Sequence, residues 1–172
     1  DFVSCGFNQI VNNLAKLHYR WGEPADVVVR LPAGAGTQAG PFHSQTNESW
    51  FAHVPGLKIV YPSNPFDAKG LLLTAFAVLY FEHKFLYRST EGLVPESYYK
   101  IPFGKAALVN EGTQLSIITY GLGVHWAKEV CEELSLKADI LDLRTLVPLD
   151  YESIEETVRK TNRVCVLHED NF

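Results

Sequence analysis

One stretch of the sequence, residues 30–45, is RLPAGAGTQAGPFHSQ, and the interpretation of the whole chain depends on it. Glycine and proline interrupt this stretch repeatedly, which is typical of a loop. An apolar run at residues 27–31 leads into it, and an amphipathic segment at residues 47–53 follows it. Open α/β sheets bind ligands at the loops that follow the carboxyl ends of their strands. We therefore predict that this loop forms part of a binding site.

The loop presents a single imidazole on a backbone rich in glycine. Three glycines allow the backbone to approach a ligand closely, because they carry no Cβ. His43 can donate or accept a proton near neutral pH, so it is the candidate catalytic residue. The alternative is a loop histidine that only bonds its own turn. Ser44 and Gln45 either support His43 or satisfy the loop backbone.

Length and composition exclude several classes of protein. The 172 residues suit one domain, or one domain and part of another, and 47% of them are hydrophobic. A net charge of -5 without a Lys/Arg run gives no case for nucleic-acid binding. No apolar segment is long enough to span a membrane. Cys5, Cys131 and Cys165 fit neither a disulfide framework nor a zinc pattern, so we expect a reducing compartment.

The first half of the chain alternates between strand and helix patterns. The predicted order is a helix that begins after Ser4 and ends at Gly22, a strand at 26–31 buried on both faces, a short helix around Trp50 and Phe51, a strand at 57–61, a helix at 66–75 with Asn64 as N-cap, and a strand at 77–82. This alternation predicts right-handed crossovers and a doubly wound parallel sheet.

The second half repeats the alternation of strand and helix patterns after a segment of different composition. Residues 89–103 are polar and interrupted by proline, so we predict an interdomain linker there. The following elements are predicted to be strands at 115–120, 138–143 and 163–167, and helices at 124–134 and 151–160, the last capped by Asp150. The predicted domains are residues 1–88 and a truncated α/β domain at 104–172.

Two features suggest that the sequence is a fragment. It contains no Met and opens in mid-pattern on Asp1-Phe2. A helix pattern at 71–76 also meets a strand pattern at 77–81 without turn residues, although such a connection normally takes a few residues. We expect that a loop is missing at 76/77. The alternative is one continuous buried helix.

Several short stretches, taken in order, point to one family. They are GAG at 34–36, GPFHSQ at 40–45, FAHVPGLK at 51–58, YPSNPFDAKGL at 61–71, FEHK at 81–84, DLRTLVPLD at 142–150 and LHED at 167–170. With these stretches, the chain resembles the beta subunit of the thiamine-diphosphate-dependent decarboxylating component of 2-oxo acid dehydrogenase complexes. The resemblance implies a pyrimidine-binding-type domain followed by part of a transketolase C-terminal-type domain.

The resemblance also implies a reaction and a cofactor. The reaction is oxidative decarboxylation of a 2-oxo acid with acyl transfer to a lipoyl group, and thiamine diphosphate acts as the electron sink. His43 matches the histidine beside the thiazolium, and Phe2 matches the aromatic ring that packs on the aminopyrimidine. A magnesium ion is expected with its ligands on a partner segment. Many members also hold a potassium ion through backbone carbonyls near residues 25–28.

The implied partners are an alpha subunit or the alpha half of a fused chain, a second beta subunit and a lipoyl-bearing acyltransferase. The implied location is the bacterial cytoplasm or the mitochondrial matrix. The activating glutamate and the diphosphate motif are expected outside this sequence, so the fragment alone is expected to be inactive. The alternatives are a transketolase or deoxyxylulose-phosphate synthase relative, and a non-catalytic assembly module of the same fold.

The sequence also contains polar and aromatic residues outside the loop that carries His43 whose roles are less specific. His53 is expected to be structural because it ends a helix. Glu82 and His83 either reach toward the site or end a solvated strand. The segment at 168–170, His-Glu-Asp, is expected to be structural or at an interface, and Trp50 and Phe51 are expected in the core or at a subunit contact.

Overall fold

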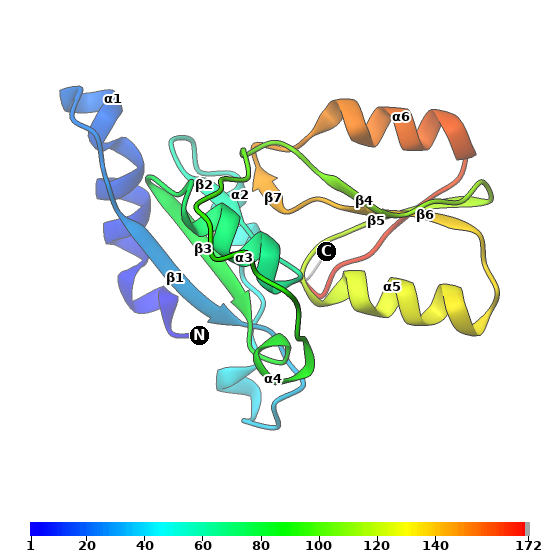
Figure 1. Cartoon of the computed structure of the whole chain (residues 1–172). Helices are drawn as coiled ribbons and strands as arrows, with labels where there is room; N and C mark the ends of the chain where they lie inside the picture. Colours follow the sequence, from blue (N-terminus) through cyan, green and yellow to red (C-terminus); the bar gives the residue numbers. More distant parts are fainter. Residues whose placement is uncertain (171–172) are drawn as a thin grey trace.

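The chain forms two four-stranded sheets within residues 1–170, which are the residues that the computed structural model describes (Figure 1). The first sheet has the strand order β1-β3-β2-β7 and the second has β4-β6-β5-β8. The strands of the first sheet are β1 (Val28–Ala33), β2 (Lys58–Val60), β3 (Val78–His83) and β7 (Thr145–Val147). Those of the second are β4 (Ala107–Asn110), β5 (Leu115–Thr119), β6 (Ala138–Asp142) and β8 (Val164–Val166). An α/β fold is confirmed.

The centre of the first sheet is parallel, as predicted. β3 pairs with β1 on one side and β2 on the other, both in parallel. The crossover between β2 and β3 is helix α3 (Pro65–Leu72), and its N-cap is Asn64, whose side chain accepts a hydrogen bond from the Asp67 N–H at 2.8 Å. Proline at the first helical position supports this start. The predicted cap is therefore confirmed.

The two faces of the first sheet carry different layers. The N-terminal helical segment and helix α2 (Ser49–Ala52) pack on the face that buries Leu31, Leu79 and Phe81. Helix α3 packs on the opposite face, over Val78 and Tyr80 (Figure 1). Strand β1 differs from the prediction, because its Arg30 and Pro32 are exposed while Leu31 and Ala33 are buried. β1 is an edge strand, so it is less buried than the central strand β3, whose residues are all buried.

Strand β7 corrects the prediction of a purely parallel sheet. It comes from the second half of the sequence, yet it pairs antiparallel with β2 in the first sheet, with Ile59 opposite Val147. The Tyr61 N–H also donates to the Arg144 carbonyl at 2.9 Å. The sequence pattern did not predict this strand, which forms through its pairing with β2. The two halves of the chain therefore share a sheet.

The second sheet is also mixed. Strand β5 pairs in parallel with β6 and β8, whereas β4, which was not predicted, pairs antiparallel with β6. Helices α5 (Leu122–Glu133) and α6 (Tyr151–Thr161) cover opposite faces (Figure 1). The Asp150 side chain accepts from the Ser153 N–H, so the predicted cap of α6 is confirmed.

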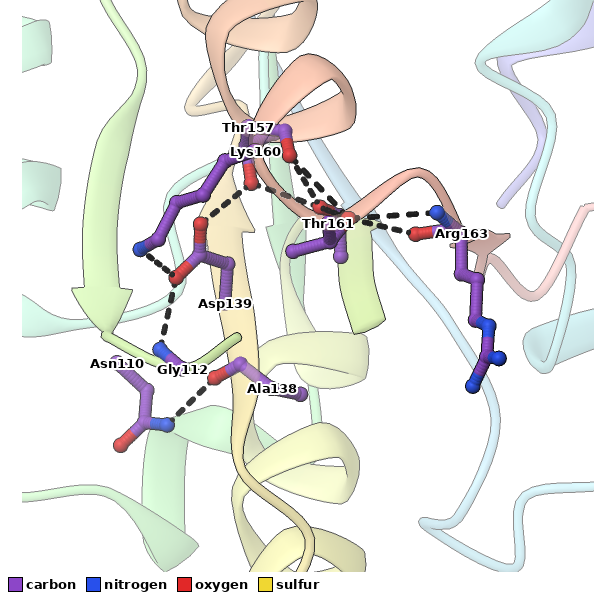
Figure 2. A network of polar contacts seen from close by, with 9 residues as sticks. Asn110, Gly112, Ala138, Asp139, Thr157, Lys160, Thr161 and Arg163 are labelled. Atoms are coloured by element: carbon purple, nitrogen blue, oxygen red, sulfur yellow. Dashed lines mark hydrogen bonds and ion pairs between the residues drawn. The ribbon is translucent and has the colours of Figure 1, made fainter. Parts of the chain in front are cut away.

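A buried polar network fixes α6 to the second sheet (Figure 2). The Asp139 carboxylate accepts hydrogen bonds from the Gly112 N–H at 2.8 Å and from Lys160 and Thr157 at 2.7 Å each. Burial opposes the charge of Asp139, but these bonds outweigh it and lower the pKa of the carboxyl. Ser116 adds hydroxyl bonds to Thr157 and Thr161. We interpret the network as structural, because its polar groups satisfy one another.

The N-terminal helical segment is irregular rather than the single helix predicted. It consists of a 3-10 turn η1 (Val3–Gly6), a π turn η2 (Gln9–Asn13), a 3-10 turn η3 (Leu14–Lys16) and helix α1 (Leu17–Trp21). Ser4 lies inside the first turn and is not a cap. Asparagine and glycine favour α-helix weakly, so tertiary packing sets the backbone here. Gly22 ends α1 in the left-handed conformation at φ 74°, as predicted.

The junction near residue 76 is a turn. Helix α3 ends at Leu72, β3 begins at Val78, and Ala77 between them has φ 51°. The alternative of one continuous buried helix is therefore wrong. A left-handed alanine is uncommon and strained, which indicates a connection that is tight for its length.

The predicted linker packs closely on α3. Between Thr90 and Phe103 the structure describes no helix or strand. Within this segment the Tyr99 hydroxyl donates to the Phe66 carbonyl at 2.8 Å, and the buried Ile101 donates its N–H to the Gly70 carbonyl at 3.1 Å.

Within residues 1–170, no helix has the length and apolar character needed to cross a membrane.

A second set of polar contacts joins the two halves. The Ser63 hydroxyl donates to the Asp142 carboxyl at 2.5 Å, and Arg144 forms an ion pair with Asp67 at 2.8 Å. The His125 ring lies 2.7 Å from the Ser63 carbonyl. Asp142 is fully buried, and burial raises its pKa from the ordinary value of 3.8 to about 6, against the opposing effect of its hydrogen bonds from Ser63 and the Arg144 N–H.

We expect this carboxyl to make stability depend on pH. Because its folded pKa is raised, its contribution is fully present below about pH 4 and is lost as pH rises through about 6. The shift corresponds to roughly 3 kcal/mol at neutral pH. Asp142→Asn, which resembles the protonated form, should therefore gain stability over the parent chain between pH 4.5 and 7.5. Urea unfolding at both pH values checks this, and an equal difference at both would contradict it.

Candidate functional site

The carboxyl ends of β1 and β3 meet at one edge of the first sheet. Ala33 lies opposite His83 in the parallel register, and the Lys84 N–H continues the ladder with a 3.0 Å bond to the Ala33 carbonyl. The chain leaves β1 at this edge and forms the loop of residues 34–45, here called the His43 loop. This is the edge at which α/β sheets bind ligands.

The His43 loop is closed at its base by its own backbone. The Gly34 N–H donates to the Gln45 carbonyl at 2.9 Å. Gly34 and Gly40 have φ values of 86° and 77°, a region that glycine enters without strain. At the tip, the 3-10 turn η4 (Pro41–His43) follows Gly40, whose carbonyl accepts from the His43 N–H at 3.2 Å and from the Ser44 hydroxyl at 2.8 Å.

The two residues predicted for the site lie in direct contact. The Phe2 and His43 rings meet edge to face, with centroids 5.2 Å apart and planes at 79°. Both side chains are open to solvent: Phe2 is 59% exposed and the His43 side chain 50%. An exposed aromatic ring beside an exposed imidazole, at the ligand-binding edge of a sheet, is an arrangement that can take a flat ring and a proton donor or acceptor together.

Lys84 links the His43 loop to the first residue of the chain. Its ammonium donates to the Asp1 carboxylate and to the His43 carbonyl. Burial lowers the pKa of Lys84. The His43 Nδ1 lies 3.7 Å from the same Asp1 carboxylate, so one acidic group faces both the ammonium and the imidazole. These contacts orient the imidazole with Nδ1 toward Asp1 and leave Nε2 as the other proton-carrying position.

A buried polar layer lies beside the His43 loop. Glu48 is 2% exposed, and the Tyr120 hydroxyl donates to it at 2.8 Å. Burial is the main cause that raises the pKa of Glu48, with the nearby Asp170 and Glu169 acting in the same direction. Tyr61 stacks on Phe81 and contacts Tyr120, which places three aromatic rings in this layer. The layer therefore has acidic character and low access to water.

The other residues that the sequence singled out do not gather around His43. His53 lies at the end of α2 and is exposed, and its structural role stays a prediction. Glu82 pairs with Arg30 and accepts from Tyr87 on the opposite face of the sheet from His43. His83 is buried and lies 2.6 Å from Glu169. Phe51 is fully buried in the core and Trp50 is 46% exposed.

A cavity of about 440 Å³ lies on the α3 side of the first sheet and does not include His43. Its lining includes Arg30, Glu82 and Tyr87, whose polar groups already pair with one another. Among residues 1–170, no group of three or more His, Cys, Asp or Glu side chains is placed to hold a metal ion.

Sequence reasoning did not assign Lys84, Glu48 or Glu169 to this region. Lys84 lies two residues after the strand predicted at 77–82, and this position near the binding edge is the signal that would have found it. Glu48 lies 72 positions from its partner Tyr120, and Glu169 lies 86 positions from its partner His83, so no short spacing relates them.

Comparison with known proteins places the chain in a class. The profile of the transketolase pyrimidine-binding domain matches residues 1–95, and that of the transketolase C-terminal domain matches residues 104–172. The chain belongs to the transketolase pyrimidine-binding domain family, with a transketolase C-terminal domain after it.

Its curated relatives are beta subunits. The chain is 46% identical over 181 positions to the 2-oxoisovalerate dehydrogenase subunit beta of Bacillus subtilis (strain 168), covering 99% of this chain and 55% of the relative. It is 47% identical over 178 positions to the acetoin:2,6-dichlorophenolindophenol oxidoreductase subunit beta of Cupriavidus necator, covering 98% and 52%. The mitochondrial 2-oxoisovalerate dehydrogenase subunit beta of Dictyostelium discoideum is 42% identical, covering 98% and 49%. The chain spans about half the length of these relatives.

A solved structure supports the fold. The chain superimposes on a split-gene transketolase, described as an inactive beta4 tetramer, with a TM-score of 0.74 and 18% identity, covering 98% of this chain and 55% of the other. At that identity the likeness concerns the fold alone.

Proposed function

We propose that the chain is part of the beta subunit of a 2-oxo acid dehydrogenase, which carries out oxidative decarboxylation of a 2-oxo acid and passes the acyl group to a lipoyl arm. The contact between Phe2 and His43 at the binding edge is the observation that carries the proposal. The names of the relatives from Bacillus subtilis and Dictyostelium discoideum support a branched-chain 2-oxo acid as substrate.

The residues present fit half of a site for thiamine diphosphate. Phe2 offers an exposed aromatic ring for the flat aminopyrimidine, and His43 offers an imidazole beside it. When bound, the cofactor supplies an electron sink for the carbon that loses carbon dioxide. His43 would hold or transfer a proton at Nε2, because Nδ1 faces Asp1. Lys84 would keep the imidazole at that position through the His43 carbonyl.

The proposed metal ions would be bound by groups other than the side chains of Phe2 and His43. We propose that a partner segment supplies the protein ligands of the magnesium ion. A potassium ion would use backbone carbonyls near residues 25–28. The Ala25 and Val27 carbonyls each accept one backbone hydrogen bond, and each keeps a second lone pair for a cation.

The proposal also includes residues missing between 76 and 77. The match to the Bacillus subtilis relative runs over 181 positions, more than the 172 residues of this chain, so that alignment contains positions absent here. The left-handed Ala77 in the tight turn supports placing them at this junction. The domain division at residues 89–103 is likewise proposed, and the two profile matches end and begin at 95 and 104.

The proposed partners are an alpha subunit or the alpha half of a fused chain, a second beta subunit and a lipoyl-bearing acyltransferase. The beta-subunit names of the relatives support a multisubunit enzyme. The proposed location is the bacterial cytoplasm or the mitochondrial matrix, since a mitochondrial relative occurs beside bacterial ones.

The test is an activity panel on the complete beta chain combined with its alpha partner. We expect dye reduction that depends on thiamine diphosphate and on a 2-oxo acid, fastest with a branched-chain acid. Pyruvate, acetoin and a ketose–aldose pair for transketolase are the comparison arms. Two-carbon transfer between sugars, without dye reduction on any 2-oxo acid, would instead establish a transketolase.

A further inference from the structure

His83 lies directly beneath the first residue of the His43 loop. It is the last residue of β3, and its side chain has no exposed surface. A Cβ added at Gly34 would stand 2.1 Å from the His83 Nε2, so only a residue without a side chain can pass over the ring. The start of the loop therefore rests on this imidazole.

The two ring nitrogens of His83 have different partners. The Phe85 N–H donates to Nδ1 at 3.3 Å, so Nδ1 acts as an acceptor. Nε2 lies 2.6 Å from the Glu169 carboxylate, to which it donates the ring proton. Because one nitrogen accepts and the other donates, the neutral tautomer with hydrogen on Nε2 satisfies both contacts. A carboxylate acceptor makes the Nε2 bond strong.

Glu169 reaches this position from the second sheet. It follows β8, and the chain after β8 runs back to the junction between the two sheets (Figure 1). Its side chain bonds His83 in the first sheet, although the two residues are 86 positions apart in the sequence. The support of the loop start therefore comes from the other half of the chain.

The same segment also holds the chain just after the His43 loop. The Glu169 carbonyl accepts from the Thr46 hydroxyl at 3.2 Å, and the Asp170 carboxylate accepts from the Ser49 N–H at 2.9 Å. The loop base itself is closed by the bond from the Gly34 N–H to the Gln45 carbonyl. Glu169 thus supports the start of the loop through His83, and residues 169–170 bond the chain after the loop directly.

We infer that His83 and Glu169 are positioning residues for His43: their hydrogen bond fixes the base of the His43 loop against the C-terminal domain and so sets where the imidazole stands. The catalytic role of His43 rests on the proposed function, whereas the positioning of the loop does not. Holding a reacting group within a fraction of an ångström controls turnover strongly, whereas binding of the substrate is affected less.

Four variants of the complete beta chain, assembled with its alpha partner, test this. In His83→Asn the shorter side chain keeps an acceptor near the position of Nδ1 but cannot reach Glu169. In His83→Gln the longer side chain places an amide N–H donor near the position of Nε2, within reach of Glu169. Glu169→Ala removes the acceptor, and the double variant His83→Asn with Glu169→Ala closes the cycle. Glu152→Gln, which loses only the exposed ion pair with Lys105, is the matched control.

Turnover is the first readout. We expect kcat to fall about 10- to 100-fold in His83→Asn and in Glu169→Ala with KM little changed. The double variant should be no slower than the worse single variant, because both remove one bond. His83→Gln should recover most of the activity. Additive losses in the double variant, or equal losses in His83→Asn and His83→Gln, would overturn the inference.

Amide hydrogen exchange is the second readout, and it does not need a working active site. Peptides covering residues 34–45 should exchange about tenfold faster in His83→Asn and Glu169→Ala, while β6 (Ala138–Asp142) keeps its protection. Unchanged exchange in the loop, or equal acceleration in β6, would contradict the inference. If the unaltered enzyme turns over no 2-oxo acid, the proposed function fails, but the exchange result still decides whether these residues position the loop.

Discussion

His43→Ala in the complete enzyme is expected to lower kcat on a 2-oxo acid by about 10²- to 10⁴-fold, the usual contribution of a positioned proton donor or acceptor. The side chain is half exposed, and its contacts are an edge-to-face ring contact with Phe2 and a long contact with Asp1. Its removal should therefore leave the fold intact. Steady-state dye reduction, together with the melting temperature, measures both effects.

The control for this variant is His53→Ala. His53 is also an exposed histidine in the first half of the chain, but it lies at the end of α2. It should retain full turnover. If His43→Ala turns over every tested acid at the unaltered rate, His43 has no catalytic role and the loop has another purpose.

Gly34→Ala is expected to have the second large effect. The new Cβ would stand 2.1 Å from the buried His83 Nε2, and the residue would keep a φ of 86° that alanine adopts only under strain. The clash and the strain together should lower the free energy of unfolding by about 2 to 5 kcal/mol. The base of the His43 loop must also shift, so turnover should fall with it. Urea unfolding and kcat are the measurements.

Gly22→Ala separates the two causes. Gly22 has a similar φ of 74° but no atom within 4 Å of an added Cβ. It should therefore show the strain alone, about 1 to 2 kcal/mol, with normal turnover. Equal losses of stability in Gly22→Ala and Gly34→Ala would mean that the His83 ring moves aside without cost and that the close approach is unimportant.

The elements with clear start or stop signals could be predicted from the sequence. Asn64 and Asp150 cap α3 and α6, and Gly22 ends α1, as expected from their side chains and backbone freedom. These signals are local, because a cap bonds a residue two or three positions away. Local chemistry is what a single sequence records best.

The errors arise where tertiary contacts decide. Strands β4 and β7 were not predicted. Both lie on the edges of their sheets, and pairing with β6 and β2 makes them strands. The irregular N-terminal helical segment follows the sheet it covers rather than an ideal helix. Packing overrides propensity in both cases.

The candidate site divides in the same way. Phe2 and His43 were named through the family resemblance, and the structure brings their rings together, although their chemical roles stay predictions. The contact of His83 with Glu169 could not be anticipated, because it joins residues from two sheets whose relative placement no short motif encodes. Burial of Glu48 likewise depends on Tyr120 from the second half.

Strand β7 means that a proteolytic cut between residues 90 and 103 would not release two independent modules. An amino-terminal piece without the second half would lack the strand that borders β2, and the unpaired backbone along β2 is the kind of edge that pairs with strands of other molecules. The two pieces should therefore remain clasped after such a cut, and a chain shortened to its amino-terminal part should tend to self-associate rather than stay dispersed.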